Sequence, residues 1–314
     1  MIALLLALVP LLVPFAAQPL ARHALDRLAP ARALWMLTAC ALALAASCAA
    51  ALGALVLTGL LKLPLFAALD DLIHPLHTPS DLLVLPAAAL ATGALALTAC
   101  TLARSALRQA GAFRTARTQA SRRPAAGDLC VVESPHPDAY ALPGRPHRIV
   151  VTTAMLRSLG AAEREALFAH ERAHNGAGHH YFLAVAELTA HCHPALHAVR
   201  ADIRFAAERA ADETAARTVG DRRLTARAIA RAALAGRVAP SSRPDFAPAA
   251  TTGPVPRRVT ALLTPGHPRA ARWIALGLAL GVALSAGSAT AAVLGVHHQV
   301  EVAQGEEHGR PSRG

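Results

Sequence analysis

Residues 170–174 read His-Glu-Arg-Ala-His and lie within a helix-forming stretch from Ala161 to Asn175. Residues four apart lie one turn apart on the same face of a helix, so His170 and His174 can bind one metal ion together. This spacing is typical of zinc sites, and it places Glu171 where a general base would take a proton from water. The alternative is the polar face of a solvated helix that contains two histidines by coincidence. We expect a Zn2+ site with Glu171 as the catalytic base.

A zinc ion held by two histidines needs a third protein ligand. The sequence from Ala201 to Val219 predicts an amphipathic helix, and its Glu208 and Asp212 lie four residues apart on one face. We expect Glu208 to bind the metal, and Asp212 to orient a histidine ligand through its other ring nitrogen. Other candidates for the third ligand are Glu187, His179, His191 and Glu213. The histidines at 179, 180, 191, 193 and 197 are otherwise interpreted as polar or membrane-interface residues.

The composition predicts that a membrane surrounds much of the chain. Hydrophobic residues make up 54% of it, charged residues only 16%, and the mean hydropathy is +0.37. A helix that crosses a bilayer needs about 20 consecutive apolar residues. A cleavable signal peptide is the rival interpretation of the first apolar segment, but its arginines follow the apolar run instead of preceding it. We expect four membrane-spanning helices, at 2–20, 34–61, 82–103 and 273–296.

The positive charges favour one orientation of these helices. The net charge is +11, but the arginines cluster beside apolar segments, which argues against direct nucleic-acid binding. Arginines follow the first and third predicted spans, whereas the loop after the second is acidic. The positive-inside rule then predicts a multi-pass protein of the cell membrane with its N-terminus outside and residues 104–272 in the cytoplasm. The tail 297–314 is then outside.

The region between the third and fourth predicted spans is the only stretch that reads as a folded domain. Leu129–Val132 and Arg148–Thr152 are rich in β-branched residues and predict two short strands, separated by a turn-rich run. The fold class is therefore mostly α: a polytopic membrane protein with about four transmembrane helices and a small α+β domain. The expected divisions are 1–104 (three spans), 105–272 (the zinc domain, with a linker at about 237–258), 273–296 (the fourth span) and 297–314 (a short tail).

Several of these segments together resemble a known family. They are residues 139–144, 149–156, 170–174 and 208–212, with Glu163 and Leu167 between them. They are similar to the membrane-embedded M56 metallopeptidases typified by the BlaR/MecR receptors, which are relatives of the M48 (HtpX and Ste24-like) gluzincins. The resemblance implies a gluzincin-type zinc peptidase in which His170, His174 and Glu208 bind Zn2+, Glu171 is the base and Asp212 supports a ligand.

The resemblance also implies partners and their limits. BlaR-type receptors carry a large penicillin-binding sensor after the last span, whereas this sequence continues for only 18 residues after Val296. We therefore do not expect β-lactam sensing. A BlaI-type transcriptional repressor is implied as a cytoplasmic protein substrate.

We expect an integral-membrane zinc endopeptidase acting on a protein or peptide substrate. The alternatives are an M48/HtpX-like membrane quality-control protease and a receptor in which zinc only braces the helices. The strand at 149–152 either aligns the substrate as a sheet edge or is an ordinary core strand. Tyr181, His179 and Arg204 are all candidates for stabilising the oxyanion.

Overall fold

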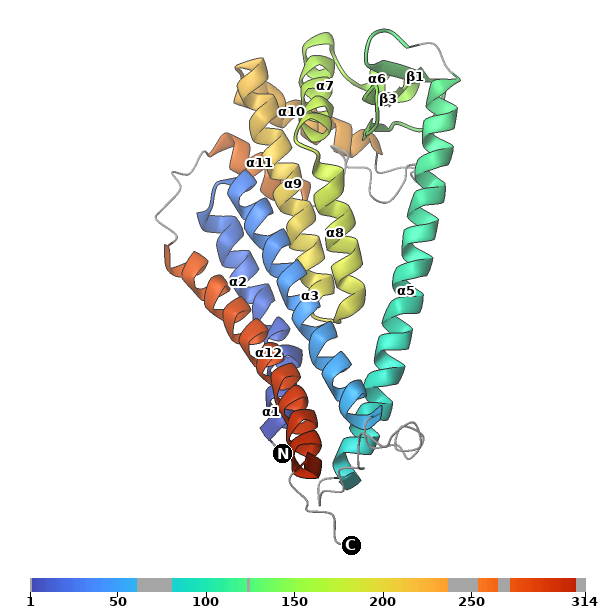
Figure 1. Ribbon diagram of the computed structural model, residues 1–314. Coiled ribbons are helices and arrows are strands. Elements are labelled where there is room, and N and C mark those ends of the chain that lie inside the picture. The colour runs from blue at the N-terminus through green and yellow to red at the C-terminus, as the bar shows by residue number, and fades with distance from the viewer. Residues whose placement is uncertain (1, 61–80, 123–124, 237–253, 265–271, 309–314) are drawn as a thin grey trace, which may run out of the picture.

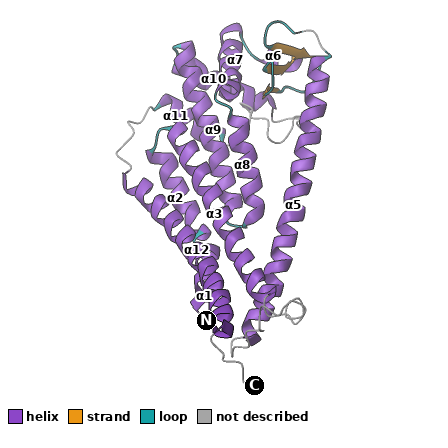
Figure 2. Cartoon of the chain, in the orientation of Figure 1, coloured by secondary structure: helices purple, strands orange, loops and turns teal. Residues whose placement is uncertain are grey.

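The computed structural model describes the chain except for residues 1, 61–80, 123–124, 237–253, 265–271 and 309–314 (Figure 1). The described chain is mostly helical, with one small sheet at one end of a long bundle (Figure 2). The helices before the sheet are α1 (Ile2–Leu12), α2 (Pro14–Arg27), α3 (Pro30–Leu60) and α5 (Asp81–Ser121). The sheet comprises β1 (Leu129–Val132), β2 (Ala139–Leu142) and β3 (Arg148–Thr152). After it come α6 (Thr153–Ser158), α7 (Ala161–Gly176), α8 (His179–Cys192), α9 (Leu196–Val219), α10 (Arg222–Gly236), α11 (Val255–Leu263) and α12 (Arg272–His308).

Three helices in the described part of the chain are long and apolar enough to cross a membrane. They are Pro30–Leu60, Leu83–Ser121 and Ala275–Gly295, which lie in α3, α5 and α12. They correspond to three of the four predicted spans, and they indicate a membrane protein. Both α5 and α12 continue well past the apolar segments predicted at 82–103 and 273–296. The basic sequence after residue 103 and the start of the predicted tail are therefore helical.

The fourth predicted span, at 2–20, is divided between α1 and α2, so a count of four spans is not confirmed. The 11 residues of α1 rise only about 16 Å, against about 30 Å for the hydrocarbon core of a bilayer. Pro14 begins α2 and has no backbone N–H to donate to the carbonyl of Pro10. The thiol of Cys48 on α3 donates to that carbonyl instead, at 3.1 Å.

The sheet has the strand order β1-β3-β2, with one strand more than the sequence predicted. β1 is parallel to β3, with Leu129 opposite Ile149. β2 is antiparallel to β3, with Tyr140 opposite Val150, and it lies in the run that had been interpreted as turns. Its four residues are too few for alternation of polar and apolar side chains to reveal a strand.

The central position of β3 corrects the hypothesis that residues 149–152 form a sheet edge. Its backbone groups pair with β1 on one side and β2 on the other, so they are not available to a substrate strand. β3 is also buried along most of its length. β3 is therefore an ordinary core strand, which was the alternative interpretation. It leads directly into α6, and the Thr152 side chain caps that helix by accepting a hydrogen bond from the Met155 N–H.

Helices α8 and α9 share one hydrophobic core with α3, a candidate membrane-spanning helix. Leu34, Leu37 and Ala41 of α3 pack in the same cluster as Phe182 of α8 and Ile203 of α9. Trp35 contacts the ring of Phe182 edge-on, with 4.7 Å between centroids. Many members of the cluster are alanines, which let helices approach closely. The predicted domain boundaries stay a prediction, but α8 and α9 do not form a core separate from α3.

The predicted linker at 237–258 lies mostly outside the described residues. Its last residues form the beginning of α11, whose Arg258 and Leu262 are buried. α11 lies beside α9 and α10, at the end of the bundle near the sheet (Figure 1).

Candidate metal centre

α7 is fixed at its start by Glu163. The backbone N–H of Gly160, the N-cap residue, donates to Glu163 Oε2 at 2.9 Å. Arg227 and Arg231 of α10 also donate to this carboxylate, at 3.2 and 3.0 Å. The hydrogen bond from Gly160 and the nearby Arg231 outweigh the effect of burial and lower the pKa of Glu163. This charged carboxylate holds the first turn of α7 against α10.

The outer face of α7 connects the helix to the sheet. Arg172, between the two histidines in sequence, is 51% exposed and forms a double hydrogen bond with Asp128, at 2.7 and 3.0 Å. The amide of Asn175 donates to the backbone carbonyl of Arg148 on β3 at 3.1 Å. The opposite face of α7, which carries the two histidines, is therefore turned towards α9.

His170 and His174 are both completely buried on that inner face. Their Nε2 atoms are 3.0 Å apart, as the one-turn spacing predicts for side chains directed at one point. The ring centroids are 4.7 Å apart and the ring planes cross at 74°. Two imidazoles held at this separation by one helix are suited to binding the same ion.

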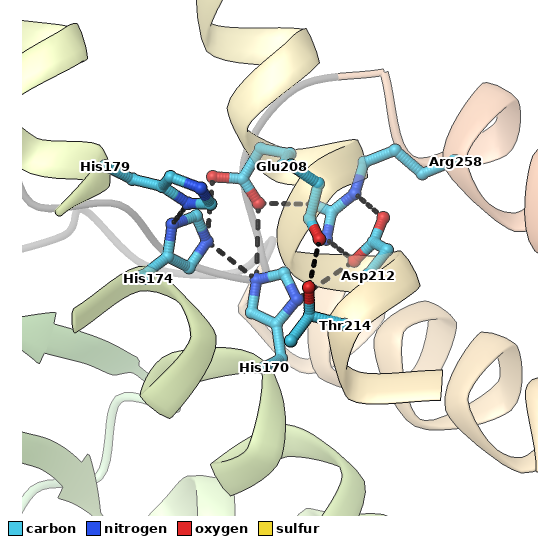
Figure 3. A network of polar contacts seen from close by, with 8 residues as sticks. His170, His174, His179, Glu208, Asp212, Thr214 and Arg258 are labelled. Carbon is cyan, nitrogen blue, oxygen red and sulfur yellow. Dashed lines mark hydrogen bonds and ion pairs between the residues drawn. The ribbon is translucent and has the colours of Figure 1, made fainter. Parts of the chain in front are cut away.

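Glu208 of α9 completes a group of three possible ligands (Figure 3). Its Oε2 is 3.5 Å from His170 Nε2, and its Oε1 is 3.6 Å from His174 Nε2. Two donors bound to one zinc ion at about 2.0–2.1 Å and a tetrahedral angle lie about 3.4 Å apart. The separations of 3.0, 3.5 and 3.6 Å lie around this value, so the three residues fit a zinc ion.

Asp212 lies one turn beyond Glu208 and contacts the other nitrogen of His170. Its Oδ1 is 2.9 Å from His170 Nδ1, and both side chains are buried. This contact keeps the Nε2 of His170 directed towards Glu208 and His174.

Arg258 of α11 is the residue of the site that sequence reasoning missed. It is completely buried, and it donates to Asp212 through Nε at 2.8 Å and through Nη2 at 2.6 Å. Its Nη1 lies 2.9 Å from Glu208 Oε2. A signal was present in the sequence: Val255, Arg258, Val259 and Leu262 follow the spacing of one helix face, which places Arg258 among apolar residues.

The buried charges in the site balance one another. Burial by itself raises the pKa of Glu208 and of Asp212, but Arg258 and the neighbouring histidines together more than offset it and lower both pKa values. Burial by itself lowers the pKa of Arg258, but Asp212 and Glu208 raise it above its ordinary value. The carboxylates are therefore ionised, as metal ligation and ligand orientation require.

Glu171, the expected base, is completely buried next to His170 in sequence. Its negative charge adds to the effects of Asp212 and Glu208, which outweigh burial and raise the pKa values of His170 and Arg258.

His179 contacts the ring nitrogen of His174 that does not face His170 and Glu208. It is buried at the start of α8, and its Nδ1 is 2.8 Å from His174 Nδ1. Burial is the main cause that lowers the pKa of His179 to about 3, followed by the neighbouring His174. The chain reverses between α7 and α8 at Gly178, whose φ of 64° suits glycine. That turn brings His179, one of the alternative third ligands, to the far nitrogen of His174.

The remaining alternative ligands are engaged elsewhere. Glu187 accepts two hydrogen bonds of 2.9 Å from Arg200, and His191 lies 3.9 Å from the same carboxylate. Glu213 forms a double hydrogen bond with Arg222, at 2.7 and 2.8 Å. Arg204, an oxyanion candidate, lies 3.8 Å from Glu187.

A largely apolar cleft of about 700 Å³ lies beside the end of α7. Trp35 and Leu42 of α3 form one wall, Tyr181 and Phe182 of α8 form another, and the loop around Arg145 lies at its rim. Tyr181, another oxyanion candidate, is therefore in this cleft and is 69% exposed.

Residues 105–202 match the family model of Peptidase family M48. No curated protein and no solved structure gave a match. The matched region runs from α5 through the sheet and the histidine-bearing helix into α9, and it supports a metallopeptidase domain of the M48 type, a class of zinc-dependent hydrolases. It ends before Glu208, so the place of Glu208 in the site rests on the helix spacing and the geometry and not on the match. The M56 assignment is not confirmed.

Proposed function

We propose that the protein is a membrane-embedded zinc endopeptidase that hydrolyses peptide bonds with Glu171 as the general base. The observation that carries the proposal is the convergence of His170, His174 and Glu208 on one buried point, with the buried Glu171 next to His170 in the sequence. Catalytic zinc sites use three protein ligands, whereas structural sites use four. Among the described residues, the group has three members. The M48 match over the histidine-bearing helix agrees with this proposal.

Some residues of the site would hold the metal ion, and Glu171 would transfer the proton. His170, His174 and Glu208 would hold zinc, which supplies Lewis-acid chemistry towards a peptide carbonyl and a water molecule. Glu171 takes a proton from the attacking water and delivers it to the leaving amine. Asp212 keeps His170 in the orientation that presents Nε2 to the ion. His179 contacts the corresponding nitrogen of His174.

The cleft beside α7 is the part of the site best placed to bind substrate. Its lining is mostly apolar and comes largely from a candidate membrane-spanning helix and from α8, and Asn175 at the end of α7 also lines it. Ligand sites are typically concave and mostly apolar, with a few polar groups, and this cleft has that character. The hydroxyl of Tyr181 is a candidate for stabilising the oxyanion in this cleft.

The more specific expectations stay predictions. They are a BlaI-type repressor as substrate, the M56 relationship, and an orientation with the N-terminus outside and the site in the cytoplasm. The M48 match favours a membrane peptidase of the M48 type among the alternatives.

The test measures zinc content and peptide cleavage on the same detergent-purified protein. We expect about one zinc ion per chain and cleavage of a fluorescence-quenched peptide library that stops when a chelator is added. Zinc without cleavage of any peptide would favour the receptor in which zinc only braces the helices. No zinc would refute the proposed function.

A further inference from the structure

Arg258 connects two residues of the centre that have different roles. Its guanidinium contacts Glu208, the carboxylate that would bind the metal, and Asp212, the carboxylate that orients His170. Two of the three prospective donors therefore depend on the position of one side chain (Figure 3). The contacts are 2.9 Å to Glu208 and 2.6 and 2.8 Å to Asp212, and all three side chains are buried.

α11, which carries Arg258, is held in place by contacts away from the centre. Arg222 of α10 donates to the carbonyls of Leu262 and Ala261 at the end of α11, at 2.8 and 3.3 Å. Leu262 is buried against Ile229 in a separate hydrophobic cluster. Arg257 lies over the ring of Phe205 on α9, 4.7 Å from its centroid. The hydrogen bonds from Arg222 and the burial of Leu262 fix the height and rotation of Arg258 relative to α9.

We propose that Arg258 is a positioning residue for the metal centre, delivered by α11, and that it holds Glu208 and Asp212 in the arrangement that binds the ion. The inference rests on the proposed metal site and adds a fourth chain segment to it. Neither the two-histidine motif nor the M48 match, which ends at residue 202, includes this residue.

The chemistry of the guanidinium explains why an arginine suits this position. A planar fork can bind both oxygens of Asp212 and still direct a third N–H at Glu208, whereas a lysine has a single nitrogen on a flexible chain. Two carboxylates that are buried side by side repel each other, and the charge between them removes the repulsion. A lysine at position 258 would keep the positive charge, but it could not hold both oxygens of Asp212 and the carboxylate of Glu208 at the same time. Replacement by lysine therefore tests whether Arg258 positions the two carboxylates or only neutralises their charge.

The experiment compares Arg258→Lys with Arg257→Lys in the full-length protein in detergent. Arg257 is the adjacent residue of the same helix, its side chain is 53% exposed, and it lies outside the centre. Lysine at this position keeps a cation that can lie over the ring of Phe205, so Arg257→Lys is a matched control. Zinc affinity is measured by competition with a chromogenic chelator. We expect Arg258→Lys to lower the affinity by about 10- to 100-fold, as loss of a residue behind a metal ligand does. Arg257→Lys should keep the affinity of the wild type.

Two further readouts distinguish positioning from a general loss of stability. Zinc should raise the melting temperature of the wild type and of Arg257→Lys by the same increment, and that increment should shrink in Arg258→Lys. Visible absorption of the Co2+-substituted protein reports ligand geometry, and its bands should shift or weaken only in Arg258→Lys. An unchanged affinity, increment and spectrum in Arg258→Lys would overturn the inference.

A second variant tests the role of α11 without altering the centre. Arg222→Gln removes the hydrogen bonds to the end of α11 and the pair with Glu213, but Arg222 contacts none of the three prospective ligands. We expect a smaller decrease in zinc affinity, of less than about tenfold. If Arg258→Lys does not fold, an unchanged affinity in Arg222→Gln overturns the inference. Failure of the wild type to bind zinc refutes the proposed function itself, whereas equal binding by the wild type and Arg258→Lys refutes only the role of Arg258.

Discussion

The metal centre and the group around Glu187 use the same kinds of side chain in different environments. In the centre, Glu208 and Asp212 meet histidines and Arg258, and these side chains are at most 4% exposed. Around Glu187, one carboxylate meets His191, Arg200 and Arg204, with exposures from 18% to 35%. Glu208 and Arg200 even lie on the same helix, α9.

The difference is in where the donor atoms point. In the centre, two imidazole nitrogens and a carboxylate converge within 4.8 Å of one another. Around Glu187, the arginines occupy the carboxylate and the nearest histidine nitrogen is 3.9 Å away. A set of residue types that can bind metal therefore becomes a candidate site only when packing removes it from water and directs its atoms at one point.

The largest effect should come from Glu171→Gln. The substitution keeps the size of the side chain but removes its capacity to accept a proton, so we expect cleavage to fall by about 10²- to 10⁴-fold while zinc binding persists. Peptide turnover and metal content are measured on the same preparation. The matched control is Glu187→Gln, the same change in the other group, which should leave turnover intact. Equal loss in both variants would contradict the comparison.

Glu208→Ala should remove zinc binding and also destabilise the fold. It deletes a prospective ligand and removes one of the carboxylate partners of Arg258; breaking a buried charge pair costs about 3–5 kcal/mol. Zinc content and the free energy of unfolding in urea are the measurements. Full zinc content in this variant would mean that the third ligand lies elsewhere, and His179, next to His174, would be examined first.

Local sequence spacing predicted the part of the site that one helix carries. His170, Glu171 and His174 lie within one and a half turns, so their arrangement follows from helix geometry. Glu208 and Asp212 were predicted as a pair by the same spacing, but their position against the histidines depends on how α9 packs on α7. Sequence reasoning therefore left Glu187, His179, His191 and Glu213 open as alternatives.

The role of Arg258 could not be predicted from local sequence spacing. Arg258 follows a Pro-, Ser- and Thr-rich stretch, and arginines near a membrane span are ordinarily interpreted as orientation signals. Only the contact of α11 with α9 gives it two carboxylate partners. The same limitation explains the missed strand β2 and the central place of β3, since strand order depends on pairing between segments distant in sequence. The division of the first apolar segment follows from Pro14, which was visible in the sequence.

A third carboxylate–arginine group, formed by Glu163 with Arg227 and Arg231, sharpens the comparison because only its carboxylate is buried. Glu163 is 6% exposed, and the arginines are 62% and 55% exposed. Since the pKa of Glu163 is lowered in the folded protein, its charge contributes stability above the ordinary value of 4.5, and that contribution is lost as pH falls through the lower folded pKa. Glu163→Gln should cost about 1.5–3 kcal/mol at pH 7.

The free energy of unfolding measured across pH checks this prediction. The difference between the wild type and Glu163→Gln should be constant above pH 4.5 and should disappear at lower pH. Arg157→Gln, which removes a charge from the neighbouring helix α6, is the control and should not reproduce this pH dependence. A difference that persists unchanged in acid would mean that packing, and not the charge of Glu163, stabilises the start of α7.

The smallest effect should come from Glu187→Gln. Arg200 and Arg204 are about one-third exposed, so water can solvate them when the carboxylate is removed, and pairs of this kind contribute less than about 1 kcal/mol. Zinc affinity should be unchanged, because Glu187 and the three prospective ligands belong to separate groups. Chelator competition and urea unfolding are the measurements. A loss of zinc in Glu187→Gln would contradict the comparison, since it would mean that the metal centre and the group around Glu187 act as one site. Burial would then not indicate which carboxylates bind or support the metal.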